Sequence, residues 1–157
     1  MATPEERLAE LGLTIPDVVP PVASYVPAVR TGSYVYTSGQ LPMRDGKLMA
    51  TGKVGADVSV EDATDCARQG ALNALAAVRA QVGDLSAVAR IVKVVVFVAS
   101  STDFTAQPSV ANGASELLGE VFGDAGRHAR SAVGVPVLPL DSPVEVDLVV
   151  EVSGDAG

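Results

Sequence analysis

The sequence predicts an α/β or α+β fold in which helices cover one face of a sheet. The elements read from the chain follow the order strands, helix, strand, helix, strands, which is typical of helices packed on a sheet. Hydrophobic residues make up 48% of the 157 residues and charged residues 19%, which excludes wholesale disorder. Aromatic residues make up only 4% and tryptophan is absent, so valine, leucine and alanine must build the core. We therefore expect a single domain over residues 1–157, helped by burial at a subunit interface.

A short helix is predicted at the start of the chain, over about residues 3–12. Thr3-Pro4-Glu5-Glu6 has the pattern of a capping box with proline at the first helical position. Leu8 and Leu11 supply an apolar face before Gly12.

The segment after this helix is rich in proline, with four between residues 16 and 27, and these favour an extended path. That density of prolines is too high for a central strand. Residues 33–37 are β-branched or aromatic and predict a strand. A turn at residues 44–46 follows, and residues 47–54 form a candidate short partner strand.

The main helix is predicted from Ser59 to Gly83. Ser59 is the expected N-cap, with Asp62 at the capping-box position. Between Ala63 and Val82 small and apolar residues recur at three- and four-residue spacing, a pattern suited to close packing on a sheet.

Three further strands and a second helix complete the predicted fold. Residues 88–99 are a Val/Ile-rich run typical of a buried strand, and residues 104–122 read as a helix. Residues 128–137 are a strand candidate. Residues 144–152 alternate so that Glu145, Asp147 and Val149 share one face of a strand.

The charge balance bears on partners and location. Eleven basic and 19 acidic residues give a net charge of −8, so a nucleic-acid partner is disfavoured. The N-terminus lacks a basic-then-apolar signal, and the apolar stretch 92–99 is too short to span a bilayer. We expect a soluble, cytoplasmic protein without a membrane partner.

Three familiar kinds of active site are not indicated. A single histidine, His128, and a single cysteine, Cys66, make a zinc site unfavourable. A Cys66/His128 dyad is formally available, although a lone cysteine in a helix is usually a small core residue. Neither a GxGxxG motif nor a P-loop follows a predicted strand.

Arg130 is the strongest candidate functional residue. It enters a strand that continues with Val133 and Val135, and a partly buried guanidinium needs an anionic partner. Residue type alone favours a structural ion pair, for example with Glu145 or Asp147. The alternative is a bidentate clamp on a ligand carboxylate.

Four other residues have both an ordinary and a functional interpretation. Glu145 either belongs to a solvated strand face or positions a water through a carboxylate whose pKa is raised by burial. Ser38 is a turn hydroxyl or a ligand hydrogen-bond partner. Tyr25 is a packing residue or contacts a ligand through its hydroxyl. His128 is a structural residue or a secondary candidate for the site.

Short motifs occur in a fixed order between about residues 22 and 152. They are Tyr25-Val26, Thr37-Ser38-Gly39-Gln40-Leu41-Pro42, Val92-Lys93 with Phe97-Val98, Ala129-Arg130-Ser131-Ala132-Val133, Leu138-Pro139 and Val144-Glu145-Val146-Asp147. Together they resemble the Rid/YjgF family, also described as L-PSP-type proteins. The chain differs from archetypal members at His128, Ala132 and Gly134, which suggests a divergent subgroup with His-Ala-Arg-Ser-Ala-Val-Gly over residues 128–134.

The resemblance implies a chorismate-mutase-like fold with a mixed sheet, and a homotrimer with ligand clefts between subunits. It also implies hydrolysis of enamines and imines such as 2-aminoacrylate to a 2-keto acid and ammonia, without a metal or organic cofactor. In that reading Arg130 pairs with the substrate carboxylate and Glu145 orients or activates water. Ser38 and Tyr25 line the pocket, and Asn112 faces the cleft. The alternatives are a non-catalytic trimer that binds a small carboxylate or regulates a partner, and a ribonuclease or translation inhibitor.

Overall fold

The computed structural model describes residues 1–21 and 23–154. The helices are α1 (Pro4–Glu10), α2 (Val60–Val82) and α3 (Gln107–Phe122), with 3₁₀ turns η1 (Leu85–Ala87), η2 (Gly123–Gly126) and η3 (Pro139–Asp141). The strands are β1 (Ala28–Thr31), β2 (Tyr34–Thr37), β3 (Met43–Arg44), β4 (Lys47–Leu48), β5 (Val88–Ala99), β6 (Ala129–Val135) and β7 (Val144–Val152).

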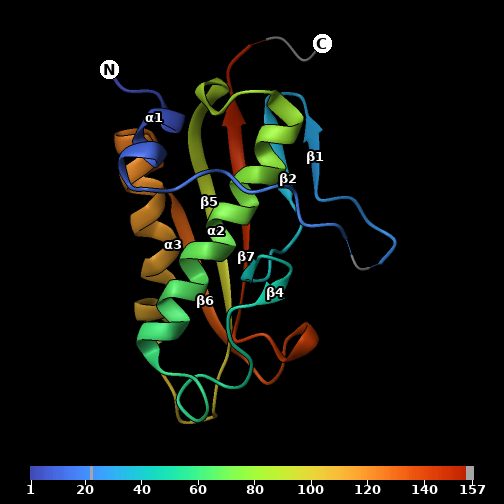
Figure 1. Cartoon of the computed structure of the whole chain (residues 1–157), viewed down its shortest axis with the longest axis vertical. Coiled ribbons are helices and arrows are strands. Elements are labelled where there is room, and N and C mark those ends of the chain that lie inside the picture. The colour runs from blue at the N-terminus through green and yellow to red at the C-terminus, as the bar shows by residue number, and fades with distance from the viewer. Residues whose placement is uncertain (22, 155–157) are drawn as a thin grey trace.

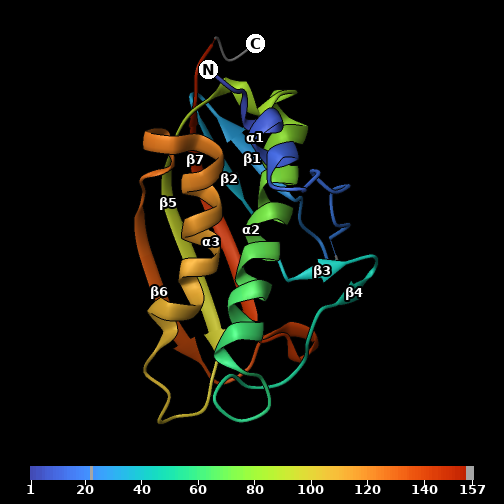
Figure 2. The ribbon, with the colours of Figure 1, turned by 60° about the vertical axis from the view of Figure 1, so that its left-hand side comes forward.

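The main sheet has five strands in the order β1-β2-β7-β5-β6. Its strands are antiparallel except for β5 and β6, which run parallel, so the sheet is mixed. The helices α2 and α3 lie side by side along one face of this sheet (Figures 1 and 2). The predicted fold class, with two main helices on one face and a short N-terminal helix, is confirmed.

The predicted helix boundaries follow from local capping. Thr3 and Glu6 form the reciprocal capping box at the start of α1. The Ser59 hydroxyl accepts a hydrogen bond from the backbone N–H of Asp62 at the start of α2. Gly83 ends α2 with a φ of +86°, a conformation that glycine adopts without strain.

Two strand predictions differ from the structure. The partner strand predicted over residues 47–54 is only Lys47–Leu48, and it pairs with Met43–Arg44 across a two-residue turn. Both turn residues, Asp45 and Gly46, have positive φ, as a tight hairpin requires. The strand β1 (Ala28–Thr31) escaped prediction because it directly follows the proline-rich run. It lies at the edge of the sheet, where such a neighbour is tolerated.

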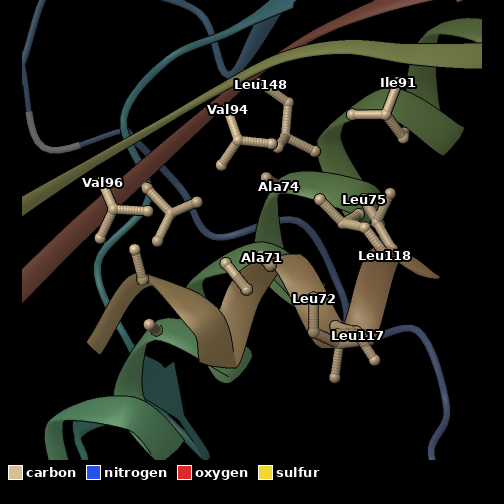
Figure 3. Packing of buried hydrophobic residues seen from close by; sticks show 14 of the residues in the cluster. Ala71, Leu72, Ala74, Leu75, Ile91, Val94, Val96, Leu117, Leu118 and Leu148 are labelled. Carbon is tan, nitrogen blue, oxygen red and sulfur yellow. The ribbon is translucent and has the colours of Figure 1, made fainter. Parts of the chain in front are cut away.

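The core lies between the helices and the sheet (Figure 3), and alanine is the most frequent core residue of α2. Alanines of α2 pack against valines, leucines and an isoleucine of β5, β7 and α3. Gly70 shows how close α2 approaches the sheet, because an added Cβ would lie 2.9 Å from a methyl of Val146. Cys66 is fully buried in this core, and burial raises the pKa of its thiol to about 11. A thiolate nucleophile at Cys66 is therefore disfavoured, and the prediction of a core cysteine is confirmed.

The opposite face of the sheet, which we call the open face, carries no helix among the described residues. Along β7 the even-numbered residues are buried beneath the helices, whereas Glu145, Asp147 and Val149 are partly exposed on the open face. Apolar side chains of other strands join them there, including Tyr36 and Val133, which are 48% and 43% exposed. The predicted alternation of β7 is confirmed, and it leaves a largely apolar sheet face uncovered.

Within the described residues, every helix is too short or too polar to cross a membrane.

Gly113 is predicted to be essential for the contact between α2 and α3. A Cβ at this position would collide with the backbone carbonyl of Thr64, so Gly113→Ala should destabilise the fold by about 1–3 kcal/mol. Gly119 on the same helix has open space around it, and Gly119→Ala should stabilise by up to about 1 kcal/mol through helix propensity. Urea denaturation of both variants at one protein concentration measures the two effects. Equal stabilities for the two variants would contradict the packing argument.

Candidate active site

Arg130 lies on the edge strand β6, where it is in register with Val94 and faces the helices. Its Nη1 donates to Asn112 Oδ1 at 2.9 Å and to Ser115 Oγ at 3.1 Å, both on α3. Its Nη2 makes a longer contact, 3.5 Å, to the carbonyl oxygen of Pro108. The guanidinium is thus held in place by α3 through neutral oxygen atoms.

The structural ion pair considered for Arg130 is wrong. The ion pairs among the described residues are Lys53–Asp141, Arg68–Glu120 and Arg127–Asp124, and none includes Arg130. Glu145 and Asp147 point to the open face, whereas Arg130 points to the helix face. A positively charged group oriented by hydrogen bonds but lacking a carboxylate among the described residues is suited to binding an anion.

Ser115 is a site residue that sequence reasoning missed. It follows Asn112 by three positions on α3, so both side chains lie on the same side of the helix. The three-residue spacing of Asn112 and Ser115, which places two uncharged polar side chains on one side of a helix, was the available signal. Asn112, expected to face the ligand cleft, accepts a hydrogen bond from the Arg130 guanidinium.

Glu145 belongs to a second group of predicted residues, around the end of β2. An added Cβ on Gly39 would lie 2.6 Å from the Glu145 carboxyl carbon, so the backbone after Ser38 passes directly against this carboxyl group. Ser38 donates from Oγ to the carbonyl oxygen of Val26 at 2.6 Å, which holds the segment carrying Tyr25 beside β2. Burial, and secondarily the charge of Asp147, raise the pKa of Glu145.

His128 precedes β6 and does not share the hydrogen bonds of Arg130. Its Nδ1 lies 3.2 Å from the carbonyl oxygen of Ala129, and the ring lines a shallow cavity with Arg90 and Arg127. Burial, together with the neighbouring Arg130 charge, lowers the pKa of His128. The neutral imidazole is therefore favoured near pH 7.

The candidate site residues other than His128 therefore form two separate groups within one chain. We call Arg130, Asn112 and Ser115 the Arg130 group, and Glu145, Gly39 and Ser38 the Glu145 group. Strand β5 lies between β6 and β7, and the two key side chains project from opposite faces of the sheet. Arg130 and Glu145 of the same chain therefore cannot act on one small substrate.

Across residues 1–21 and 23–154, no three histidine, cysteine, aspartate or glutamate side chains lie together in a way that could hold a metal ion.

The mixed sheet with two helices on one face is a chorismate-mutase-like fold, and comparison with known proteins identifies the family. A family model described as "YjgF/chorismate mutase-like, putative endoribonuclease" matches residues 5–152, so the chain belongs to this family. The predicted membership of the Rid/YjgF family is thereby confirmed.

Individual relatives cover nearly the whole chain. Protein TCP17 of Trypanosoma cruzi is 46% identical over 94% of this chain and 92% of its own length. A 2-iminobutanoate/2-iminopropanoate deaminase of Salmonella typhimurium is 37% identical over 82% of this chain and 87% of its own length. The crystal structure of Agrobacterium tumefaciens protein Atu1372, with unknown function, is 47% identical with a TM-score of 0.88, covering 96% and 92% of the two chains.

Glu145 is predicted to make stability depend on pH. The pKa of Glu145 is higher in the folded chain than in the unfolded chain, so folding favours the protonated carboxyl. The stabilisation linked to this protonated form is fully present below about pH 4, where the carboxyl is protonated in both states, and it is lost as pH rises through the folded pKa. Glu145→Gln should therefore be more stable than wild type at neutral pH, with the difference shrinking toward pH 4. Urea denaturation at several pH values measures this trend. Glu116→Gln, an exposed position on α3, is the control, and the same trend there would contradict the assignment to Glu145.

Proposed function

We propose that this protein is a deaminase that hydrolyses the enamine or imine of a small 2-keto acid, such as 2-aminoacrylate, to the keto acid and ammonia. The observation that carries the proposal is Arg130, a guanidinium held by Asn112 and Ser115 and lacking a carboxylate among the described residues. Such a group binds the carboxylate of a small substrate in a defined orientation. The Salmonella relative named as an imine deaminase supports the choice of reaction.

The proposed chemistry needs one carboxylate anchor and one group that moves protons. An enamine first tautomerises to the imine, and water then adds to the C=N carbon while Glu145 accepts a proton from that water. Glu145 passes this proton to the nitrogen, which gives the neutral carbinolamine. The nitrogen then takes up a second proton, and the C–N bond breaks as the hydroxyl group loses its proton, so the products are the keto acid and ammonia. The raised pKa of Glu145 suits both directions of transfer, because protonated and ionised forms are then accessible closer to neutral pH.

The separation of the two groups leads to the proposed assembly. Since Arg130 and Glu145 of one chain face opposite sides of the sheet, the substrate would lie between Arg130 of one chain and Glu145 of the partner subunit. A homotrimer with clefts between subunits provides this pairing, as the family resemblance implies. The exposed apolar residues of the open face support association, since burying Tyr36 and Val133 would remove apolar area from water.

The charge of the chain favours this function over ribonuclease activity. With 19 acidic and 11 basic residues, the net charge of −8 opposes the polyanion binding that RNA cleavage requires. The family description includes endoribonucleases, yet a single histidine offers no histidine pair for cleavage.

Arg130→Ala is predicted to lower kcat/KM for enzymatically generated 2-aminoacrylate by about 100-fold, because truncating one partner of a hydrogen-bonded charge pair costs about 2–5 kcal/mol. Arg127→Ala is the matched control, since its side chain is 86% exposed and forms only a distant ion pair with Asp124. Arg127→Ala should keep wild-type activity. Full activity of Arg130→Ala would contradict the site, whereas carboxylate binding without turnover by the wild-type protein would indicate a non-catalytic binding protein.

Val133→Asp is predicted to break the proposed trimer. A charge on the open face would have to be buried without a partner in the assembled form, which is strongly unfavourable. Light scattering coupled to gel filtration should give a mass three times that of one chain for the wild-type protein and a lower mass for the variant. Leu11→Asp, an exposed position after α1, should remain trimeric. A monomeric wild-type protein at micromolar concentration would overturn the proposed assembly.

A further inference from the structure

A second cavity lies on the helix side of the sheet, beneath the proline-rich segment that follows α1. Figure 1 shows this segment crossing α2 on its way from α1 to β1. The cavity has a volume of about 830 Å³ and lies between this segment, α2 and the β3–β4 hairpin. Apolar lining comes from Leu13, Pro16, Val18, Val19, Leu41 and Leu72. Its size and lining are those of a site for a small organic molecule.

The polar part of this cavity is a chain of buried amides that ends on an arginine. Asn73 is 1% exposed, and its Nδ2 donates to the carbonyl oxygens of Leu41 and Met43, each at 3.0 Å. Its Oδ1 accepts from Gln69 Nε2 at 3.1 Å. Gln69 Oε1 in turn accepts from Arg44 Nε at 3.3 Å. The amides of α2 thus hold the hairpin and the arginine on it in one orientation.

This chain of amides also orients Arg44, which lines the cavity. With Nε committed to Gln69, the two terminal nitrogens remain available as a fork that matches a carboxylate. Arg44 takes part in none of the ion pairs among the described residues. Asp17 and Asp45 also line the cavity, so one arginine beside two carboxylates disfavours a ligand with more than one negative charge.

We propose that this cavity binds a small monocarboxylate with an apolar body, its carboxylate on Arg44 and its chain against the proline-rich segment and Leu72. The two charged residues of the proposed active site, Arg130 and Glu145, do not line this cavity, and neither does Ser38. Tyr25 and Gly39 do line it, so it adjoins the Glu145 group. The proposal stands whether or not the protein is a deaminase.

The test is a titration of the full ¹⁵N-labelled chain with octanoate, followed by NMR chemical shifts. Saturable binding should shift the amides of α2 near Gln69 and Asn73 and those of the β3–β4 hairpin. Suberate, a dicarboxylate of the same length, and octanamide, which lacks the charge, should each bind at least about 10-fold more weakly. Arg44→Ala should weaken octanoate binding by about 10-fold or more, as the loss of a charge-assisted hydrogen bond predicts.

Lys47→Ala is the matched control, because Lys47 lies opposite Arg44 in the same hairpin and does not line the cavity. This variant and Arg130→Ala should both bind octanoate as the wild-type protein does. Val18→Asp places a charge in the apolar lining and should abolish binding. The proposal is overturned if octanoate shows no saturable binding at millimolar concentration, if Arg44→Ala binds normally, or if suberate binds as tightly as octanoate.

Discussion

The close approach of α2 and α3 is the constraint on which the rest of this structure depends. A core poor in aromatic residues must gain its burial from many small contacts, which requires helices that nearly touch. Gly113 allows this, because its α-carbon lies directly against the backbone of Thr64. The neighbouring positions Asn112 and Ser115 are then held at the distance where they bind Arg130. The close contact between α2 and α3 therefore determines both the packing of the core and the orientation of the Arg130 guanidinium.

The alternation of side chains along β6 and β7 places the two groups of the candidate site on opposite faces of the sheet. In β6 the register places Arg130 beside Val94 under the helices, while in β7 Glu145 lies beside Phe97 on the open face. A shift of either strand by one residue would bring both groups to the same face, but it would also expose the core valines. The core thus forces the two groups apart within a chain, and a site that uses both requires a second chain.

Sequence reasoning was most successful where a local signal acts alone. The caps at Thr3 and Ser59 and the alternation of β7 depend on neighbouring residues, and all three were predicted correctly. The structural ion pair considered as an alternative for Arg130 is absent, because Glu145 and Asp147 lie on the other face of the sheet, and a strand's periodicity does not reveal which face meets the helices. Ser115 was missed for a related reason, since its role depends on the position of α3 above β6.

The amino-acid sequence by itself determined the element types and the family, because each depends on short-range patterns or on motifs in a fixed order. Only the tertiary structure decided what Arg130 touches, how Arg44 is oriented and that the site residues fall into two groups. Those contacts join residues far apart in the chain, such as Arg44 with Gln69, or Gly39 with Glu145. Their geometry follows from the packing of whole helices and strands, which no local pattern specifies.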